Sequence, residues 1–324
     1  MNNSNSSLLS KLRMYILFTL LIIIVGSLFY NKISIPSTKT EYIDNSAKEL
    51  KNKSKTSLDQ KGSTKPFFNI SIKLVVVADS HLNKDSFNKI KNILVESKNI
   101  DLLIHLGDHT DYGDLISLKE AKKELDSLAI PYIALPGDRD LAETSSEENF
   151  YKVFPNKTTL NIKGIKLTFF NNSRNFLPYP DSYIADFITK IKGTDFLFTS
   201  QPIYVDKSNL FSQKYMGSTE AFPDLSGQAK SNLEKYSSQR ELILKSLRES
   251  EVKLIVSGDH HRSSEFQDPK NPKISYHIVG ATAEKISLGK TELKQEALQT
   301  QRVSLIEIGT NKEFRITEII LNEK

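Results

Sequence analysis

Five apolar stretches of this chain each end in side chains that can bind metal ions. The polar ends are Asp79 with His81, Asp108, Asp138 with Asp140, Ser200, and Asp259 with His261. Carboxylate and imidazole groups are common ligands of divalent ions, and a buried carboxylate is costly unless a cation or hydrogen-bond donors offset its charge. The pattern therefore predicts that these residues gather around a metal site.

Cysteine is absent from all 324 residues of the sequence. Disulfide bonds and thiolate zinc sites are thereby excluded, so any metal has to be held by oxygen and imidazole ligands. The polar ends of the five stretches supply ligands of that kind.

Strands and helices alternate in the part of the chain that carries the first motifs. The predicted strands are 73–78, 101–106 and 132–135, and the predicted helices are 85–97 and 115–128. This alternation predicts a parallel sheet with right-handed crossovers, in which the carboxyl ends of the strands meet at one ligand-binding rim. Residues i and i+2 of a strand point the same way, so Asp79 and His81 are expected to reach one ion.

The second half of the chain contains a further series of strands. The predicted elements are a hairpin of residues 159–162 and 165–171, helices 183–191 and 239–249, and strands 252–257, 275–279, 303–308 and 314–321. Residues 203–228 show no clear period and predict a long loop, a kind of segment that often carries specificity. The last two strands are expected to be antiparallel and to form a second sheet packed on the first.

The amino-terminal residues predict a membrane segment. Residues 14–30 are nearly all apolar and contain no charge, which is short for a membrane span but within the usual range. Two alternatives remain open, an uncleaved anchor and a signal peptide cut near residues 25–27, and the bulky residues 28–30 favour the anchor.

The expected domain organisation follows from this segment and from composition. Residues 1–13 are expected to be a short cytoplasmic segment, 31–66 a flexible polar linker and 67–324 the folded domain, outside the cytoplasm. The positive residues flanking the span are nearly balanced, so the positive-inside rule decides little about orientation. We expect a single-pass protein of the cell membrane.

The net charge of +5 is located in the amino-terminal part. Residues 1–68 hold ten basic and four acidic residues, a balance of +6, which leaves −1 for the remaining 256 residues. Proteins that bind nucleic acid are usually basic where they contact it, so nucleic acid is disfavoured as a partner of the folded part.

The motifs together resemble those of the calcineurin-like metallophosphoesterase family, from about Lys73 to the carboxyl terminus. That family has the motifs Asp-x-His, Gly-Asp, Gly-Asn-His followed by Asp or Glu, a His two residues before proline, and Gly-His-x-His. The resemblance implies an α/β fold of two packed mixed β-sheets flanked by helices, an αββα sandwich. It also implies two divalent ions bridged by a carboxylate and by a hydroxide that attacks phosphorus. On this pattern Asp79, His81, Asp108 and His261 complete the first metal site, with Asp108 as the bridge.

The second metal site departs from the family pattern at each of its own ligands. Asp138 stands where the family has Asn, Ser200 replaces the His before Pro202, and Asp259 replaces the first His of Gly-His-x-His. Arg139 stands where the family has the His that assists the leaving group. The departures indicate either a decayed site or a site for a hard cation, because carboxylates and a hydroxyl suit Mg²⁺, Mn²⁺ or Ca²⁺ better than zinc.

Charge favours an occupied second site. Asp79, Asp108, Asp138 and Asp259 together carry −4, which two divalent ions formally neutralise. Without an ion, Asp138 and Asp259 would raise each other's pKa with little beyond Arg139 to offset them. We therefore expect one or two divalent ions: Mn, Mg, Ca, Fe or Zn at the first site and a hard cation at the second.

Arg139 is the candidate catalytic residue beside Asp108. It cannot give up a proton at ordinary pH, so it cannot act as a general acid. It is expected either to bind a phosphoryl oxygen and stabilise transition-state charge or to pair with Asp140. His109 and Asp111, which follow the bridging Asp108 in the sequence, are expected to surround it, and Asp140 is expected among the same supporting residues. The remaining histidines, interpreted as structural, are His105, His260 and His277.

Three functions are compatible with these residues. The leading hypothesis is a membrane-anchored, metal-dependent phosphoesterase that hydrolyses a phosphomonoester or phosphodiester, its substrate a phosphorylated small molecule or a lipid-linked compound. Because a neutralised metal centre activates water less, slow turnover or a substrate with a good leaving group is expected. The alternatives are a non-catalytic metal-dependent binding domain displayed at the membrane, and a nuclease.

Overall fold

The computed structural model of the protein describes residues 69–174, 177–205, 225–283 and 301–321. The chain divides into two units, Met1–Phe67 and Phe68–Lys324, and every described residue belongs to the second. The predicted segments 1–13, 14–30 and 31–66 therefore lie outside the described residues. Within the described ranges, no helix has the length and apolar character that a membrane crossing requires.

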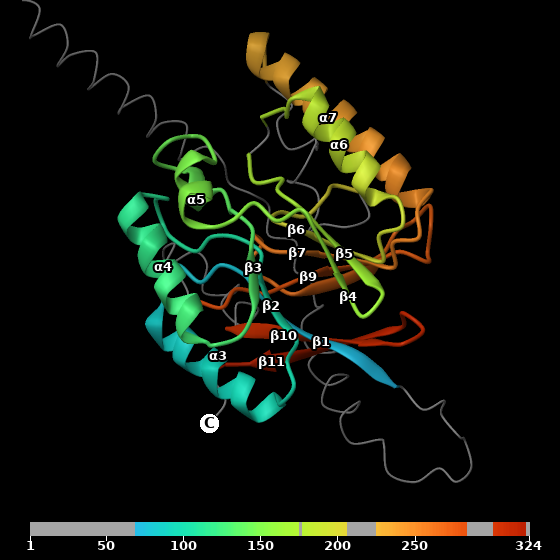
Figure 1. The fold of residues 1–324 in the computed structure, drawn as a ribbon. Helices are drawn as coiled ribbons and strands as arrows, with labels where there is room; N and C mark the ends of the chain where they lie inside the picture. The colour runs from blue at the N-terminus through green and yellow to red at the C-terminus, as the bar shows by residue number, and fades with distance from the viewer. Residues whose placement is uncertain (1–68, 175–176, 206–224, 284–300, 322–324) are drawn as a thin grey trace, which may run out of the picture. The chain divides into compact units, whose positions relative to one another are not determined.

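The first sheet has five strands and joins the two ends of the domain (Figure 1). Its order is β11 (Phe314–Ile320), β10 (Arg302–Gly309), β1 (Ile70–Val77), β2 (Leu102–His105) and β3 (Tyr132–Ala134). Strands β1, β2 and β3 are parallel, whereas β10 runs antiparallel to β1 and β11 antiparallel to β10. The prediction that β10 and β11 form a second sheet is therefore wrong, because β10 pairs with a strand at the opposite end of the domain, and hydropathy does not reveal such long-range pairing.

The second sheet has six strands, drawn from the middle of the chain. Its order is β4 (Thr159–Ile162), β5 (Ile165–Phe170), β6 (Phe196–Thr199), β7 (Leu254–Ser257), β9 (Ser275–Ile278) and β8 (Ser264–Gln267). The four central strands are parallel, and the edge strands β4 and β8 are antiparallel to their neighbours. The predicted hairpin is confirmed, and its turn residues Lys163 and Gly164 both have positive φ angles.

Helices cover the outer face of each sheet. The helices on the first sheet are α3 (Lys84–Ser97), α4 (Leu115–Ser127) and α5 (Glu148–Val153), and those on the second are α6 (Asp181–Ile191) and α7 (Gly227–Arg248). Side chains at the amino ends fix where two of them start: Asn83 accepts a hydrogen bond from the Ser86 amide before α3, and Asp114 caps α4. The layers follow the order helix, sheet, sheet, helix (Figure 1), which confirms the predicted sandwich.

Three short elements and the start of α7 differ from the prediction. Helix α5, strand β8 and the 3₁₀ helix η1 (Arg139–Leu141) were not predicted, because each is too short to show a period. Helix α7 begins at Gly227, whereas the pattern predicted Gln239. Its first turns bury only Leu233 and Tyr236, so the apolar spacing there is sparse.

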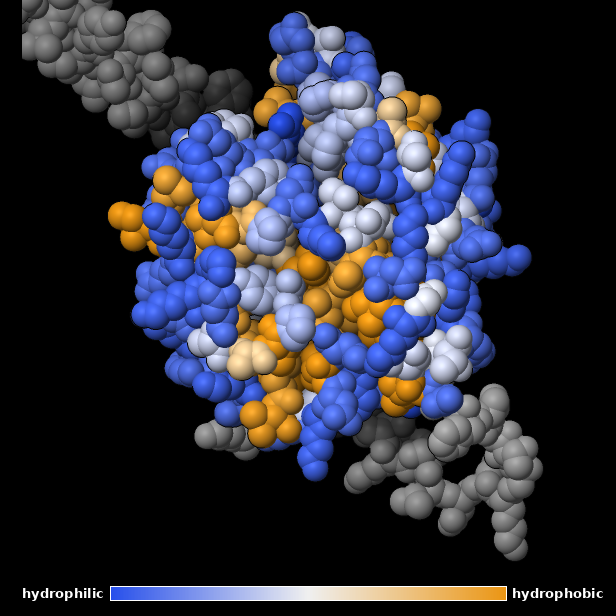
Figure 2. Space-filling view, in the orientation of Figure 1, coloured by the Kyte–Doolittle hydropathy of each residue, from blue (hydrophilic) through white to orange (hydrophobic). Residues whose placement is uncertain are grey.

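The pleat of the strands divides the core into layers. Ile72, Leu74 and Val76 of β1 face the second sheet, while Val75 and Val77 pack against α3 and α4. The second sheet divides its apolar residues in the same way, between the central core and helices α6 and α7. The central core reaches the surface at the edge strands β3 and β4, where Figure 2 shows apolar residues between the two helical layers.

The carboxyl ends of the parallel strands meet at one rim, as predicted, but they come from two sheets. The last residues of β1, β2 and β3 pair with one another across the first sheet, and those of β6 and β7 pair across the second. The two rows touch, since a Cβ added to Gly258 after β7 would lie 2.9 Å from Cβ of Ala78 after β1. Polar residues that follow these strands are thus brought to a common edge.

Candidate metal centre

The turns after β1, β2 and β7 hold the candidate ligands in an uncommon backbone conformation. Asp79, His81, Asp108, Asp259 and His261 have φ angles of 54°, 44°, 55°, 71° and 59°. Residues other than glycine rarely adopt positive φ, and these five candidate ligands are five of the twelve such residues in the described part of the chain. Because β1 ends before Asp79, the side chains of Asp79 and His81 come together through a turn, and not through the strand pleat as predicted.

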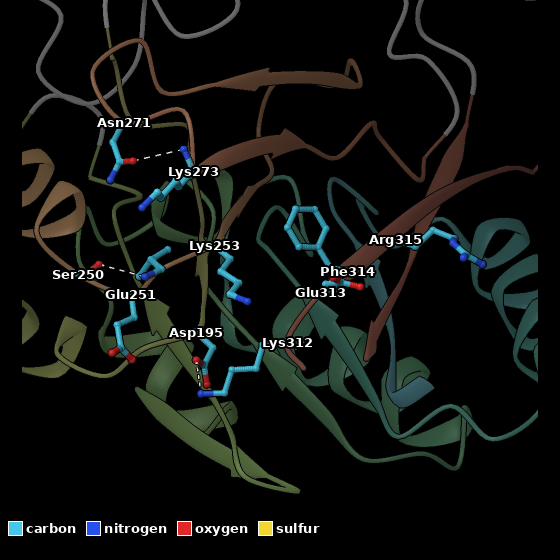
Figure 3. Close-up of a pocket in the computed structure, with 11 residues that line it drawn as sticks. Asp195, Ser250, Glu251, Lys253, Asn271, Lys273, Lys312, Glu313, Phe314 and Arg315 are labelled. Carbon is cyan, nitrogen blue, oxygen red and sulfur yellow. Dashed lines mark hydrogen bonds and ion pairs between the residues drawn. The ribbon is translucent and has the colours of Figure 1, made fainter. Parts of the chain in front are cut away.

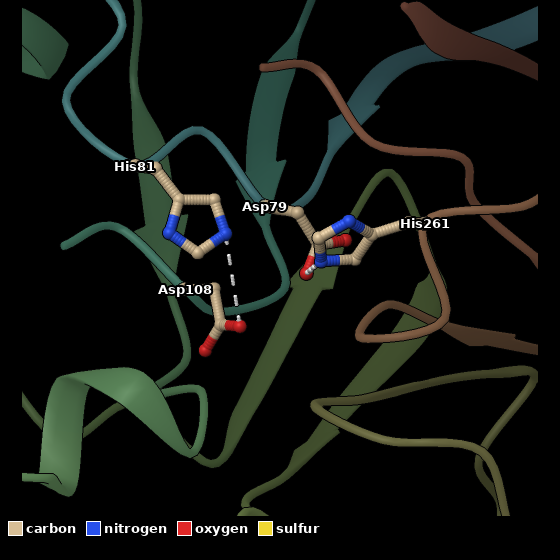
Figure 4. Close-up of side chains that lie close together, drawn as sticks. All are labelled: Asp79, His81, Asp108 and His261. Atoms are coloured by element: carbon tan, nitrogen blue, oxygen red, sulfur yellow. Dashed lines mark ion pairs between the residues drawn. The ribbon is translucent and has the colours of Figure 1, made fainter. Parts of the chain in front are cut away.

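Four of the predicted ligands lie together in space (Figure 4). One ligand atom from each of Asp79, His81, Asp108 and His261 lies within 4.8 Å of those of the other three. Nε2 of His81 is 4.0 Å from Oδ2 of Asp108, and Nε2 of His261 is 3.5 Å from Oδ1 of Asp79. These separations place all four side chains within reach of a single ion. We call this set the first cluster.

In the described part of the chain, three buried polar atoms of the first cluster lack the hydrogen bonds that would offset their burial. Asp79 is fully buried, and among the described residues neither of its carboxylate oxygens has a hydrogen-bond partner; nor does Nε2 of His81. Buried polar atoms without partners cost free energy, and a cation would satisfy them. The residues present therefore fit a divalent ion.

The acids of the cluster repel one another. Burial first, and the charges of Asp259 and Asp138 next, raise the pKa of Asp79 well above its ordinary value. Burial and the charge of Asp138 also raise the pKa of Asp108. A divalent cation between these groups would favour their ionised forms.

The first cluster contains two imidazoles, those of His81 and His261. Nδ1 of His81 is 2.8 Å from Oδ1 of Asp111, a contact that orients the ring and leaves Nε2 on the side of Asp108. Burial, and then the neighbouring His81, lower the pKa of His261 to about 4, so this imidazole is neutral at ordinary pH. Asp111, which was expected beside the bridging Asp108, thus contacts a different ligand, His81.

Three predicted ligands form a second cluster that shares Asp108 with the first. Ligand oxygens of Asp108, Asp138 and Asp259 all lie within 4.8 Å of one another. Ser200 follows β6, and its carbonyl oxygen accepts a hydrogen bond of 3.2 Å from the amide of Gly258. Its buried Oγ has no hydrogen-bond partner among the described residues. Asp108 has two oxygens and lies between the clusters, as a bridging carboxylate requires.

Asp140 does not pair with Arg139. It joins the two Gly-Asp loops, which contain Gly107-Asp108 and Gly137-Asp138. Its carboxylate accepts hydrogen bonds from the amides of His109, Thr110 and Gly137 at 2.9–3.1 Å. Burial alone would raise the pKa of Asp140, but His109 and these amides lower it below its ordinary value. No Arg139–Asp140 ion pair is formed in the described part of the chain, so that alternative for Arg139 is not supported. The Arg139 side chain is exposed, while its amide donates to Oδ1 of Asp108 at 3.1 Å.

The remaining histidines lie outside both clusters. His109 contacts Oδ2 of Asp140 through Nδ1 at 2.9 Å and stacks on His105, with ring centroids 3.7 Å apart. His105 is buried against Oγ of Ser80, and His277 against Oγ of Ser304. These contacts agree with the structural interpretation of His105 and His277; His260 is half-buried and belongs to neither cluster.

Sequence reasoning missed Gln201, the neighbour of Ser200. Its Nε2 donates a hydrogen bond of 2.9 Å to Oδ1 of Asp259, an acid of the second cluster. No motif includes this position, so only its adjacency to Ser200 in the sequence pointed to it.

Glycine is required where the two Gly-Asp loops touch. A Cβ on Gly137 would lie 2.0 Å from Oδ1 of Asp108, and a Cβ on Gly107 would lie 2.6 Å from Cα of Gly137. Any side chain at these positions would displace the Asp108 carboxylate or separate the loops. The glycines therefore set the position of the group that both clusters share.

A separate cavity lies at the opposite ends of the parallel strands. It has a volume of about 890 Å³ and is lined by residues that precede β6, β7 and β9 and by the turn between β10 and β11. Figure 3 shows Lys253, Lys273 and Phe314 there, together with the ion pair between Lys312 and Asp195 (2.8 Å). It shares no residue with either cluster, so the candidate chemistry is not in this cavity.

Because the pKa of Asp79 is raised, we expect the free energy of unfolding of the metal-free protein to depend on pH. The folded pKa lies above the unfolded value of about 4, so stability is lost as pH rises towards and through the folded pKa. We expect Asp79→Asn to raise the melting temperature in EDTA at pH 7.5, by roughly 2–4 °C for each kcal/mol recovered, with the gain shrinking towards pH 4.

The same variant should respond less to metal. Added Mn²⁺ is expected to raise the melting temperature of the wild type and to have little effect on Asp79→Asn. The exposed Asp186→Asn is the matched control and should behave as wild type in both conditions. If Asp79→Asn and the wild type had equal melting temperatures in EDTA at pH 7.5, ionised Asp79 would not destabilise the metal-free protein, contrary to this prediction.

Comparisons with known proteins agree with this geometry. A family model described as calcineurin-like phosphoesterase matches residues 72–263. The protein named "Probable metallophosphoesterase" of Methanocaldococcus jannaschii is 34% identical over 92 residues, which are 28% of this chain and 38% of that protein. The match thus spans less than half of the relative's length.

Two solved structures have a similar fold. A dimetal phosphatase from Danio rerio gives a TM-score of 0.50 at 9% identity, covering 78% of this chain and 100% of that one. A purple acid phosphatase from yellow lupin gives 0.53 at 10% identity, covering 78% and 52%. At such identities these likenesses show the fold alone. The family match, in contrast, covers more than half of the sequence and contains every residue of both clusters, and so the chain belongs to the calcineurin-like phosphoesterase family.

Proposed function

We propose that this chain is a membrane-anchored enzyme that hydrolyses a phosphomonoester or phosphodiester at the centre around Asp108. The observation that supports this most strongly is that Asp108 belongs to two clusters of ligands, beside buried atoms of Asp79 and His81 that have no hydrogen-bond partner in the described residues. Divalent ions held there would supply positive charge to phosphoryl oxygens and activate a water molecule. Membership of the family supports a metal-dependent phosphoric ester hydrolase.

The two clusters differ in the ions that they suit. The first cluster combines imidazole with carboxylate and suits Mn, Mg, Ca, Fe or Zn. The second offers only carboxylate oxygens, from Asp108, Asp138 and Asp259, and it suits a hard cation. We assign the hydroxyl of Ser200, a buried group without a hydrogen-bond partner in the described residues, as a further oxygen ligand. With Asp79, the four carboxylates carry a formal charge of −4 at neutral pH when ionised, which matches two divalent ions.

Arg139 is assigned to the substrate. Its side chain is exposed next to the second cluster, and its amide is bonded to Asp108, so the backbone of Arg139 is fixed while its guanidinium can bind a phosphoryl oxygen. A guanidinium does not donate a proton to a leaving group at ordinary pH. Substrates whose leaving group is a weak base should therefore react best.

Asp108→Asn tests this function directly. The substitution keeps the size of the side chain but removes the charge shared by both clusters, so Mn²⁺-dependent hydrolysis of an aryl phosphate by the full chain in detergent should fall to background. Asp186→Asn, on the exposed face of α6, should retain wild-type turnover. A wild type without any metal-dependent turnover, or an Asp108→Asn protein as active as wild type, would end the proposal.

A non-catalytic metal-dependent binding domain is the second candidate, favoured by the absence of imidazole from the second cluster. The triple variant Arg139→His, Ser200→His and Asp259→His distinguishes the two. Our proposal expects the wild type to be active and the triple variant to lose activity with Mn²⁺, because the arrangement of oxygen ligands is broken. An inactive wild type that gains turnover in the triple variant would favour the binding domain.

The cellular setting is a further part of the proposal. We assign residues 14–30 as an uncleaved anchor, with 1–13 in the cytoplasm, 31–66 as a linker and the domain from residue 67 outside, acting on a phosphorylated small molecule or a lipid-linked substrate. The charge of −1 on residues 69–324 argues against nucleic acid. In intact cells, protease added outside should degrade the domain, and its release by salt washing or its full protection would contradict this topology.

A further inference from the structure

The residue that follows Ser200 holds one acid of the second cluster in place. Gln201 is 4% exposed, and its Nε2 donates a hydrogen bond of 2.9 Å to Oδ1 of Asp259. This bond restricts the rotation of the Asp259 carboxylate, one oxygen of which lies within 4.8 Å of ligand oxygens of Asp108 and Asp138. The side-chain amide of Gln201 thus fixes the orientation of the Asp259 carboxylate relative to the other acids of the second cluster.

The backbone of Gln201 is itself held from two sides. The side chain of Asn172, which follows β5, accepts from the Gln201 amide at 2.8 Å and donates to its carbonyl oxygen at 2.7 Å. Oγ1 of Thr199 donates to the same carbonyl at 2.9 Å and lies 2.8 Å from Oγ of Ser257 on β7. These buried contacts tie Gln201 to the ends of three neighbouring strands, so its side chain starts from a fixed position.

A neutral donor suits this position because the acids of both clusters lie nearby. Asp259 contributes to the raised pKa of Asp79 and of Asp108, so another carboxylate would add repulsion, while a cationic side chain would compete with a metal ion. An amide hydrogen bond stabilises the charge of Asp259 without either effect.

We infer that Gln201 is a positioning residue that orients Asp259 and so sets the affinity of the second cluster for a hard divalent cation. This inference rests on the proposed two-ion centre. Residues that hold a metal ligand in place are typically worth 10–100-fold in metal affinity. The first cluster does not include Asp259, so its affinity should depend far less on Gln201 than that of the second cluster.

Mn²⁺ titration of the full chain in detergent, followed by calorimetry and by electron paramagnetic resonance, tests the inference without using activity. The wild type should bind two ions, and their spectrum should show spin coupling between ions that share Asp108. In Gln201→Ala, the affinity of the first binding step should be unchanged and that of the second should fall by about 10–100-fold. With one equivalent of Mn²⁺ added beyond saturation of the first site, this variant should therefore lack the spin-coupled signal. The unchanged first step reports that the variant is folded.

Gln201→Glu separates a positioning role from direct ligation. If the amide nitrogen faces Asp259, the glutamate repels it and the second step weakens further than in Gln201→Ala. If the second step strengthens, the side chain is a ligand and the positioning role is overturned. Gln228→Ala, at an exposed position near the start of α7, is the control and should bind two ions as the wild type does.

The outcomes keep this inference distinct from the proposed function. Two ions in the wild type with an unchanged second step in Gln201→Ala would overturn the role of Gln201 and leave the two-ion centre standing. One ion in the wild type would overturn the role of Gln201 and the second site together. No bound ion would overturn the proposed function as well.

Discussion

Mutual repulsion among buried carboxylates is the constraint on which this structure depends. Asp79 and Asp108 are buried at the junction of two sheets, with Asp138 and Asp259 close enough that their charges raise both pKa values. A fold that only needed to be stable would replace these acids or give them hydrogen-bond donors. Asp79 is neither replaced nor given a hydrogen-bond donor for either oxygen in the described residues, so the arrangement is best understood as a receptor for positive charge.

The sandwich supplies that arrangement because neither sheet is sufficient alone. The first sheet contributes the turns after β1, β2 and β3, and the second contributes those after β6 and β7, and the two rows of turns touch at Gly258. Positive φ angles turn the ligands back over the strand ends, and the close approach of Gly107 and Gly137 sets the position of Asp108. Backbone strain and the acid repulsion are offset by the packed cores on both sides.

Much of this was predictable from sequence because local patterns carry it. Strand ends followed by Asp79, Asp108 and Asp138 appear as breaks in apolar runs, and the parallel crossovers bring such breaks to one rim. The side chains expected to share an ion, among them His81 and His261, do lie together. The likeness to the family extends as far as residue 263, beyond which β8, β9, β10 and β11 still complete the two sheets.

What could not be predicted depends on contacts between distant residues. The pairing of β10 with β1 has no local signal, and neither does the bond from Gln201 to Asp259. The sequence suggested an Arg139–Asp140 pair because the two are adjacent, but the Asp140 carboxylate instead bonds to the amides of the neighbouring loop. The turn that brings Asp79 to His81 was mistaken for a strand, because an i, i+2 spacing is compatible with both.

We propose that a divalent cation holds the acids and imidazoles around Asp108 together. Anomalous diffraction from a crystal of the protein grown with Mn²⁺ tests this, because it locates the metal independently of any assumed ligand. We expect an anomalous peak in coordination contact with Asp79, His81, Asp108 and His261, and a second peak on the side of Asp138 and Asp259. A map without a peak beside Asp108, at Mn²⁺ concentrations that saturate the protein in solution, would contradict it.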